Sequence, residues 1–178
     1  MLPEAFLTRM QAQLGEEYPE FLNSLERPRA VALRLNPLKG KMPQLPFAQE
    51  PVPWEPMGFY YDPNARPGLH PYHDAGVYYL QEASAMSAVA LLDPQPGECV
   101  CDLCAAPGGK TTQIAGRMMG KGLLLCNEIN PKRAKILSRN MERMGVANGL
   151  VTNEHPGRLA EKYCGIFGKH RKCLMHRQ

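Results

Sequence analysis

The stretch from Glu98 to Thr112, ECVCDLCAAPGGKTT, constrains the fold of this chain more than any other. It predicts a short apolar strand over residues 99–103, a turn of small residues, and a helix that begins near Lys110. The glycines of the turn let a ligand approach the backbone, and the first N–H groups of the helix point toward that ligand. This arrangement is typical of a binding site for a nucleotide-like molecule.

Helices and strands are predicted to alternate on both sides of this stretch. Residues 82–92 form a helix of small residues, and residues 123–126 form a buried strand. A helix then covers residues 131–144, and a third strand begins at Leu150. Because parallel strands need crossover helices at this spacing, the pattern predicts right-handed βαβ units and an α/β fold.

The N-terminal third reads differently. Residues 3–26 show helical periodicity, with a break before Pro19, and residues 30–35 alternate like a strand. Residues 37–75 then hold more than half of the 17 prolines, which predicts an extended connector with few regular elements. The connector also contains Trp54 and several other aromatic residues, so we expect it to pack against a neighbouring part of the protein.

Composition places the chain among globular proteins. Of its 178 residues, 44% are hydrophobic and 21% are charged, and no apolar run is long enough for a membrane span. The acidic N-terminus has no apolar signal core, so a cytoplasmic location without membrane contact is expected. The net charge of +4 arises from residues 162–178, which hold five basic residues and no acid, because residues 1–161 carry a net charge of −1.

Glu128 adds a second element to the predicted binding site. It follows the strand over residues 123–126, twenty residues after Gly108. In doubly wound folds an acid at this place accepts the hydroxyls of a bound ribose. The alternatives are a solvated cap at Glu128 or a phosphate-binding loop over residues 104–111. Cys104 replaces the first glycine of that loop, and no later strand ends in the aspartate that would hold magnesium, so the ribose interpretation is favoured.

The cysteines are interpreted as buried small hydrophobic residues with reduced thiols. Cys99, Cys101 and Cys104 crowd into one strand and its turn, without the paired spacing of zinc sites, so no metal is expected. Cys104 could be reactive at a helix N-terminus, although a structural role suits its place in the turn better. The tail from Tyr163 onward is expected to be a disordered basic end, with RNA contact as the alternative.

Residues 102–115, DLCAAPGGKTTQIA, followed by Asn127-Glu128, closely resemble the Nop/Sun family of RNA cytosine-5 methyltransferases, and in particular its bacterial branch for small-subunit ribosomal RNA. The resemblance covers roughly residues 1–167. The further segments that carry it are LRLNPLK (33–39), VPWEPMGFYYD (52–62), RPGLHPYHDAGVYYLQEASAM (66–86) and residues 130–162.

The resemblance implies a class I, Rossmann-like methyltransferase fold that binds S-adenosyl-L-methionine and acts on RNA. The turn would wrap the methionine end and the adenosine, Glu128 would hold the ribose, and Lys110 would lie near the target base. A further contact, to the adenine, would come from Asn153 or Glu154. The residues implied in cofactor binding are Cys104, Ala105, Ala106, Pro107, Gly108, Gly109, Lys110 and Glu128.

The same resemblance divides the chain into three parts. Residues 1–75 resemble the family's small N-terminal α+β RNA-binding portion with its connector. Residues 76–162 resemble half of the cofactor-binding domain, and residues 163–178 form a divergent basic tail. The implied partner is RNA, with small-subunit ribosomal RNA as the expected substrate.

The family's catalytic cysteines have no counterpart in this sequence. The nucleophile of the family stands in a Thr-Cys motif and the second cysteine in an Asp-Ala-Pro-Cys motif, and neither motif occurs here. After Phe167 the chain departs from the family pattern and reads GKHRKCLMHRQ. We therefore expect a C-terminally truncated, frame-shifted fragment without catalytic residues, or alternatively a remnant that only binds the cofactor or RNA. With three strands of the sheet present, the strand before the turn should lack one neighbour.

Overall fold

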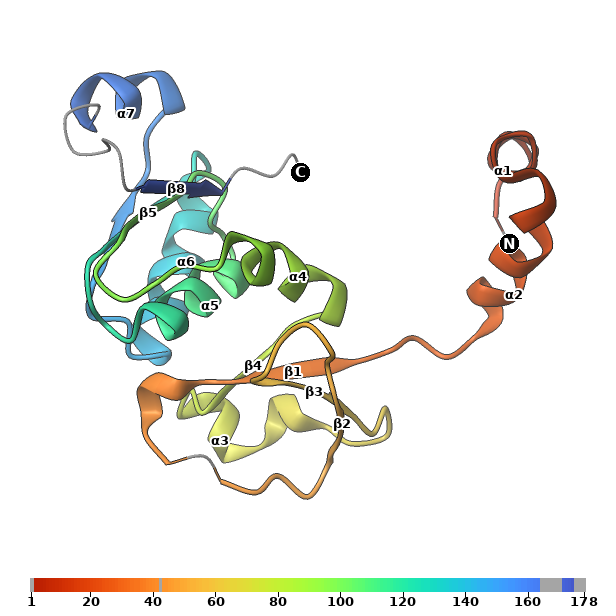
Figure 1. The fold of residues 1–178 in the computed structure, drawn as a ribbon, viewed down its shortest axis with the longest axis horizontal. Helices are drawn as coiled ribbons and strands as arrows, with labels where there is room; N and C mark the ends of the chain where they lie inside the picture. The colour runs from red at the N-terminus through yellow and green to blue at the C-terminus, as the bar shows by residue number, and fades with distance from the viewer. Residues whose placement is uncertain (1, 42, 164–170, 175–178) are drawn as a thin grey trace.

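The computed structural model describes residues 2–41, 43–163 and 171–174. The described chain forms a pair of N-terminal helices, a four-stranded antiparallel sheet and a four-stranded parallel sheet with helices on its faces (Figure 1). Within these residues, no helix combines the length and the apolar character needed to cross a bilayer.

The N-terminal helices form an arm that stands away from the two sheets (Figure 1). The arm comprises α1 (Glu4–Leu14), the 3-10 turn η1 (Gly15–Glu17) and α2 (Tyr18–Glu26). The predicted helices and the role of Pro19 in the first turn of α2 are confirmed. The two helices contact each other through aromatic rings, with 6.3 Å between the ring centroids of Phe6 and Phe21.

The antiparallel sheet has the strand order β2-β3-β1-β4. Its central strand β1 buries all four of its residues, and Leu33 pairs with Phe59 on one side and with Leu80 on the other. Its core joins Leu33 and Leu35 to the fully buried Tyr78. The strands are β1 (Ala32–Leu35), β2 (Ala48–Pro51), β3 (Gly58–Tyr61) and β4 (Tyr78–Leu80).

The expected connector over residues 37–75 is more regular than its prolines predicted. It supplies β2 and β3 of this sheet, together with the 3-10 turns η2 (Pro37–Lys39) and η3 (Pro67–Leu69) and the short helix α3 (Pro71–Asp74). Four of the prolines stand at places in these elements where no backbone N–H is needed. Pro51 is the last residue of the edge strand β2, and the first residues of η2, η3 and α3 are Pro37, Pro67 and Pro71.

The aromatic residues of this segment are packed only in part. Phe59 and Tyr61 pack against the core of the antiparallel sheet. Trp54 is 42% exposed, although its indole Nε1–H donates a hydrogen bond of 2.7 Å to the carbonyl oxygen of Ala83. Tyr72 is exposed as well. The segment therefore belongs to the sheet and contacts the following helix at its start.

The parallel sheet has the strand order β7-β6-β5-β8, and all its pairs are parallel. Its strands and helices confirm the α/β fold expected from the alternation of elements. The elements are α4 (Ala83–Leu92), β5 (Cys99–Asp102), α5 (Gly109–Met118), β6 (Leu123–Asn127), α6 (Pro131–Arg143), β7 (Gly149–Thr152), α7 (Pro156–Tyr163) and β8 (Arg171–Leu174).

Strand β8 corrects two expectations about the tail. The tail was expected to be a disordered end, and β5 was expected to lack a neighbour on one side. Instead, residues 171–174 pair in parallel with β5, with Cys99 opposite Arg171 and Cys101 opposite Cys173. The backbone groups at the edge of β5 can pair with any extended segment, so β8 forms despite the absence of an apolar period. Tyr163, the first residue of the expected tail, ends α7, and residues 164–170 and 175–178 lie outside the described residues.

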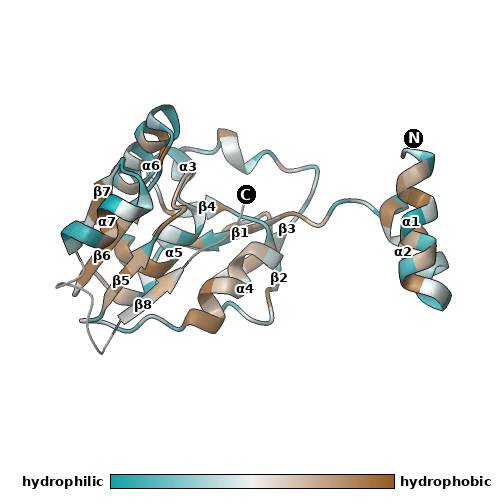
Figure 2. Ribbon diagram, turned by 90° about the horizontal axis from the view of Figure 1, so that it is seen from above, coloured by the Kyte–Doolittle hydropathy of each residue, from teal (hydrophilic) through white to brown (hydrophobic). Residues whose placement is uncertain are grey.

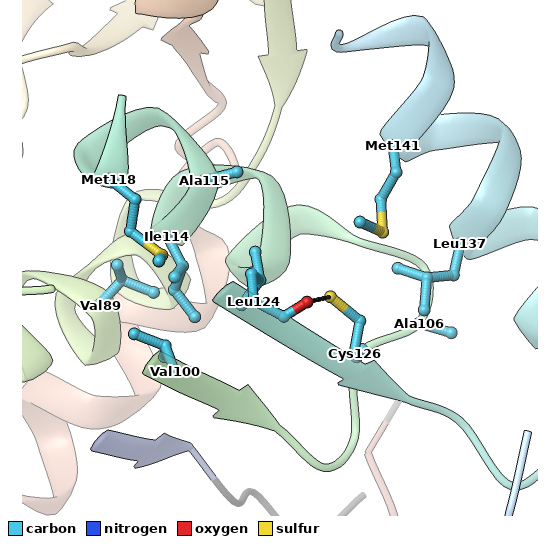
Figure 3. Packing of buried hydrophobic residues seen from close by; sticks show 11 residues of the cluster. Val89, Val100, Ala106, Ile114, Ala115, Met118, Leu124, Cys126, Leu137 and Met141 are labelled. Carbon is cyan, nitrogen blue, oxygen red and sulfur yellow. Dashed lines mark hydrogen bonds between the residues drawn. The ribbon is translucent and has the colours of Figure 1, made fainter. Parts of the chain in front are cut away.

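Helices cover both faces of the parallel sheet. On one face, α4, α5 and α6 bury a continuous core against β5 and β6 (Figure 3). In that core Ile114, Leu124 and Leu137 are fully buried. On the other face, Leu159 of α7 packs against Cys101 and Leu125. The hydropathy colouring shows the apolar strands β5 and β6 in brown, the hydrophilic helix α7 mostly in teal, and α4 largely in brown (Figure 2).

A close backbone contact joins the antiparallel sheet to α6. Gly76 has a φ of +69°, and a Cβ at this position would lie 2.0 Å from the carbonyl oxygen of Arg143. Next to it, the side-chain amide of the buried Asn36 donates to the carbonyl oxygens of Gly76 and Met144, at 2.8 Å each. The C-terminal end of α6 is therefore held by the first sheet, and only glycine fits at position 76.

We predict that Gly76→Ala destabilises the protein more than Gly120→Ala does. Gly120 has a φ of +71° and no atom within 4 Å of a Cβ, so its substitution adds backbone strain alone. That strain costs about 1 kcal/mol. The Gly76 substitution adds a clash with backbone atoms and should cost roughly 2–4 kcal/mol in the free energy of unfolding. Urea denaturation of both variants measures the difference, and equal losses would contradict the close contact.

Candidate functional site

The predicted turn lies between β5 and α5, and a buried aspartate holds its two ends together. Asp102, the last residue of β5, is 1% exposed. One of its carboxylate oxygens accepts the backbone N–H of Cys104 at 3.2 Å, and the other accepts the hydroxyl of Thr111 at 2.7 Å. Both ends of the turn are therefore hydrogen-bonded to one carboxylate, which belongs to the last residue of β5.

Helix α6 holds the same turn from outside. Arg133 donates from Nη2 to the carbonyl oxygen of Ala106 at 2.7 Å, and Asn140 donates from Nδ2 to that of Pro107 at 2.8 Å. The peptide bond between Ala106 and Pro107 is cis. Gly108 has a φ of +115°, and its Cβ would lie 3.3 Å from a methyl group of Leu137. The path of the backbone is thus fixed at three successive residues.

Helix α5 begins directly after the turn, at Gly109. The first N–H groups of a helix have no intrahelical partner, and they carry the positive end of the helix dipole. Gly109 also faces the antiparallel sheet, because a Cβ there would lie 3.5 Å from the ring of Tyr79. The turn can therefore present polar N–H groups to a ligand in a space that glycine keeps open.

Glu128 follows β6, the strand next to β5 in the sheet, and is 3% exposed. Its carboxylate accepts the backbone N–H of Asn130 at 2.9 Å and lies 3.5 Å from the guanidinium group of Arg133. Because Arg133 also holds the carbonyl of Ala106, one side chain links the acid to the turn. The two parts predicted from sequence, the turn and the acid, meet at the carboxyl end of the sheet.

A cleft with a volume of about 270 Å³ opens beside the turn. The segment from β4 to the start of α4 forms one wall, and the turn with the start of α5 forms the other. It is lined by Tyr79, Leu80, Gln81, Glu82, Ala85, Ala105, Ala106, Pro107, Gly109 and Lys110. Five of the expected site residues therefore border this cleft, whereas Cys104, Gly108 and Glu128 are not among the residues that line it. Strand β4 of the antiparallel sheet supplies part of the opposite wall.

A buried arginine of β1 connects that opposite side to α5. Arg34 is 3% exposed, and burial lowers its pKa to about 10, so the side chain remains charged at neutral pH. It donates to the carbonyl oxygen of Gly109 at 2.9 Å, to the hydroxyl of Thr112 at 2.8 Å, and to the side-chain oxygen of Gln81. The N-terminal sheet thus contacts the first residue of α5 directly.

The two residues proposed for adenine contact lie beyond β7 and have partners within the chain. Asn153 donates from its amide to the carbonyl oxygens of Glu128 and Ile129, at 2.6 and 2.9 Å. The carboxylate of Glu154 lies 3.4 Å from Arg158 and 3.8 Å from Lys162. The amide of Asn153 therefore fixes the backbone at Glu128 and Ile129.

Two buried cysteines of the parallel sheet, Cys101 in β5 and Cys126 in β6, have raised pKa values. Burial raises the pKa of Cys101 to about 12 and that of Cys126 well above its usual value. Of the three clustered cysteines that were expected to be buried, Cys101 is buried, whereas Cys99 and Cys104 are only half-buried. Among the described residues, no group of three or more histidine, cysteine or acidic side chains could hold a metal ion.

The sequence identified the turn and Glu128 but missed the residues that hold them. Asp102 carried a readable signal, because it ends an apolar strand directly before the turn. Arg133, Asn140 and Arg34 carried none, since a basic or amide residue on a helix or in an alternating strand is usually exposed. Their roles depend on contacts between segments far apart in the chain.

Two family models together match nearly the whole chain. The N-terminal domain of the 16S rRNA methyltransferase RsmF matches residues 2–83, and the 16S rRNA methyltransferase RsmB/F matches residues 89–171. The curated "Ribosomal RNA small subunit methyltransferase F" of Salmonella newport is 38% identical over 166 residues. That match covers 85% of this chain and 35% of the relative, so the chain spans about a third of the length of such relatives.

Solved structures show the same fold. A methyltransferase homologue from Pyrococcus horikoshii is 28% identical with a TM-score of 0.75, over 90% of this chain and 60% of its own. The protein PH0851 is 26% identical with a TM-score of 0.80, over 89% and 38%. NSun6 from Pyrococcus horikoshii, at 16% identity and a TM-score of 0.74, covers 89% and 67% and shares the fold. The chain belongs to the RsmB/F branch of the Nop/Sun methyltransferase family.

Proposed function

We propose that this chain is the cofactor-binding part of an S-adenosyl-L-methionine-dependent RNA cytosine-C5 methyltransferase that acts on small-subunit ribosomal RNA. The observation that carries the proposal is the placement of Glu128. Its carboxylate is buried at the carboxyl end of β6, and Arg133 connects it to the turn that opens α5. A buried acid in this position is typical of doubly wound proteins that bind a ribose.

The chemistry of the site fits S-adenosyl-L-methionine. The carboxylate of Glu128 can accept hydrogen bonds from two ribose hydroxyls, and the cleft beside Pro107 and Lys110 offers space for the amino-acid end. The residues Cys104 to Lys110 would surround the rest of the molecule, and the N-terminus of α5 would face its carboxylate. When bound, the cofactor supplies an electrophilic methyl group on its sulfonium sulfur.

Two observations support ribosomal RNA as the substrate, namely the family and the placement of Lys110. The relatives that match are named as methyltransferases of small-subunit ribosomal RNA. Lys110 lines the cleft beside the turn, where a cation can hold a polar edge of a base next to the methyl donor. The antiparallel sheet forms the other wall, which supports a role of the N-terminal portion in presenting RNA to the site.

The 178 residues of this chain contain neither of the motifs in which the family's catalytic cysteines stand. Methyl transfer to C5 of cytosine needs a thiolate that adds to C6, and the family's Thr-Cys and Asp-Ala-Pro-Cys motifs do not occur among its 178 residues. Cys104 lies in the turn between β5 and α5, whose backbone would bind the cofactor. This absence favours a second candidate function, namely a non-catalytic remnant that binds S-adenosyl-L-methionine or RNA only.

Calorimetric titration of the 178-residue chain with S-adenosyl-L-methionine should show saturable binding, and Glu128→Gln should weaken it. The substitution removes the charge that holds the ribose hydroxyls, and a hydrogen bond to a charged group contributes about 1.5–3 kcal/mol. We therefore expect the Kd to rise about 10-fold or more.

Glu142→Gln is the matched control, because it removes the same charge from an exposed position of α6. It should leave the Kd unchanged. A thermal melt of each variant without ligand establishes that the fold is retained. Equal affinity of wild type and Glu128→Gln would remove Glu128 from the binding site, and absence of binding to the wild type would overturn the proposed cofactor.

The chain on its own should not methylate RNA cytosine. Incubation with small-subunit ribosomal RNA and cofactor labelled in its methyl group should give no incorporation above background, because no cysteine stands in a catalytic motif. A full-length relative of the family provides the positive control in the same assay. Incorporation at C5 of cytosine by this chain would show that one of its own cysteines serves as nucleophile.

A further inference from the structure

Three cations line the outer face of α6. Lys132, Lys135 and Arg139 are all exposed, and their spacing of three and four residues places them along one side of the helix. The buried stripe of α6 faces the opposite way. That stripe consists of Ala134, Leu137 and Met141.

These three cations differ from the other basic residues of the helix. Arg133 holds Glu128 and the turn, and Arg143 donates to the carbonyl oxygen of His73. None of the ion pairs found among the described residues involves Lys132, Lys135 or Arg139. The one acid of α6, Glu142, is exposed near its C-terminal end. On this helix only Glu142, three residues after Arg139, can offset part of the positive charge of this face.

The charges of this face oppose the stability of the helix. A cation in the first turn, such as Lys132, lies at the positive end of the helix dipole. Like charges three or four residues apart repel each other, as Lys135 and Arg139 do. The helix carries five basic residues and one acid, whereas residues 1–161 as a whole have a net charge of −1. Such a local concentration of positive charge is suited to an anionic partner.

The position of the face points to the partner. Helix α6 starts three residues after Glu128, at the carboxyl end of the sheet, and Asn140 on its side holds the carbonyl of Pro107 in the turn. A polyanion lying along α6 would therefore pass beside the proposed cofactor site. Ile136 is 47% exposed on the same face and offers an apolar contact between the cations, as ribose and base surfaces require.

We propose that Lys132, Lys135 and Arg139 bind successive phosphates of the RNA that is methylated. This inference rests on the proposed function, since it takes RNA as the substrate. This surface on α6 would be a second RNA-binding surface of the chain, besides the one proposed for the N-terminal portion. The contacts are electrostatic and independent of sequence, so they hold the strand in place while other residues select the base.

The test is fluorescence anisotropy of a labelled oligocytidylate titrated with the 178-residue chain at several salt concentrations. The double variant Lys135→Glu, Arg139→Glu should raise the Kd at low salt by at least about 10-fold. The slope of log Kd against log salt should fall by about 1.4, because two phosphate contacts to a single strand are lost.

The control variant Lys121→Glu, Lys162→Glu changes the net charge by the same amount. Lys121 precedes β6 at the opposite end of that strand from Glu128, and Lys162 lies near the end of α7; both are exposed. The control should bind the RNA nearly as well as wild type. Equal losses in the two double variants would mean that only net charge matters and would overturn the proposal, as would a wild-type chain that does not bind the RNA.

Titration of the same proteins with S-adenosyl-L-methionine separates this proposal from the proposed function. The Lys135→Glu, Arg139→Glu variant should bind the cofactor with the affinity of the wild type, because neither residue contacts the turn. RNA binding that depends on α6, together with no cofactor binding in the wild type, would sustain the RNA surface and refute the proposed cofactor. Cofactor binding with RNA binding insensitive to α6 would refute the surface alone.

Discussion

A buried chain of polar side chains joins the antiparallel sheet to α5, and the proposed site depends on it. Arg34 donates to Gln81, Gln81 donates to Gln113 at 3.2 Å, and Gln113 donates to Glu55. Arg117 completes the chain with a contact of 3.0 Å to Glu55. Each group in a buried network of this kind needs its partners, because an unpaired polar group in the interior costs about 1–3 kcal/mol.

This network fixes the position of the antiparallel sheet relative to α5. Arg34 of β1 donates to the carbonyl oxygen of Gly109 at the start of α5, and Gln113 of α5 donates to Glu55 in the loop between β2 and β3. A shift of the antiparallel sheet relative to α5 would leave several of these groups without partners. The wall of the cleft formed by Tyr79 and Gln81 is therefore fixed relative to the turn, which is what a site built between two layers requires.

The part of this structure that could be predicted is the part whose signals are local. The strand, small-residue turn, helix and following acid occupy residues 99–128 and read directly from the sequence. The roles of Asp102 and Arg133 needed the fold, because each holds a backbone group of the turn through a side chain. Strand β8 also escaped prediction, because its four residues pair with the edge of β5 and no pattern of their own requires a strand.

Helix α6 combines two tasks on its two sides, and this division explains its unusual composition. Its inner side must bury Leu137 and hold the turn through Arg133 and Asn140, which fixes those positions. Its outer side is free of packing constraints, so helix stability alone would favour acids in the first turn and alternating charges along the face. The face has Lys132, Lys135 and Arg139 instead. A charge pattern that opposes the helix dipole, on the helix that also holds the turn, is consistent with the RNA phosphates proposed to lie along this face.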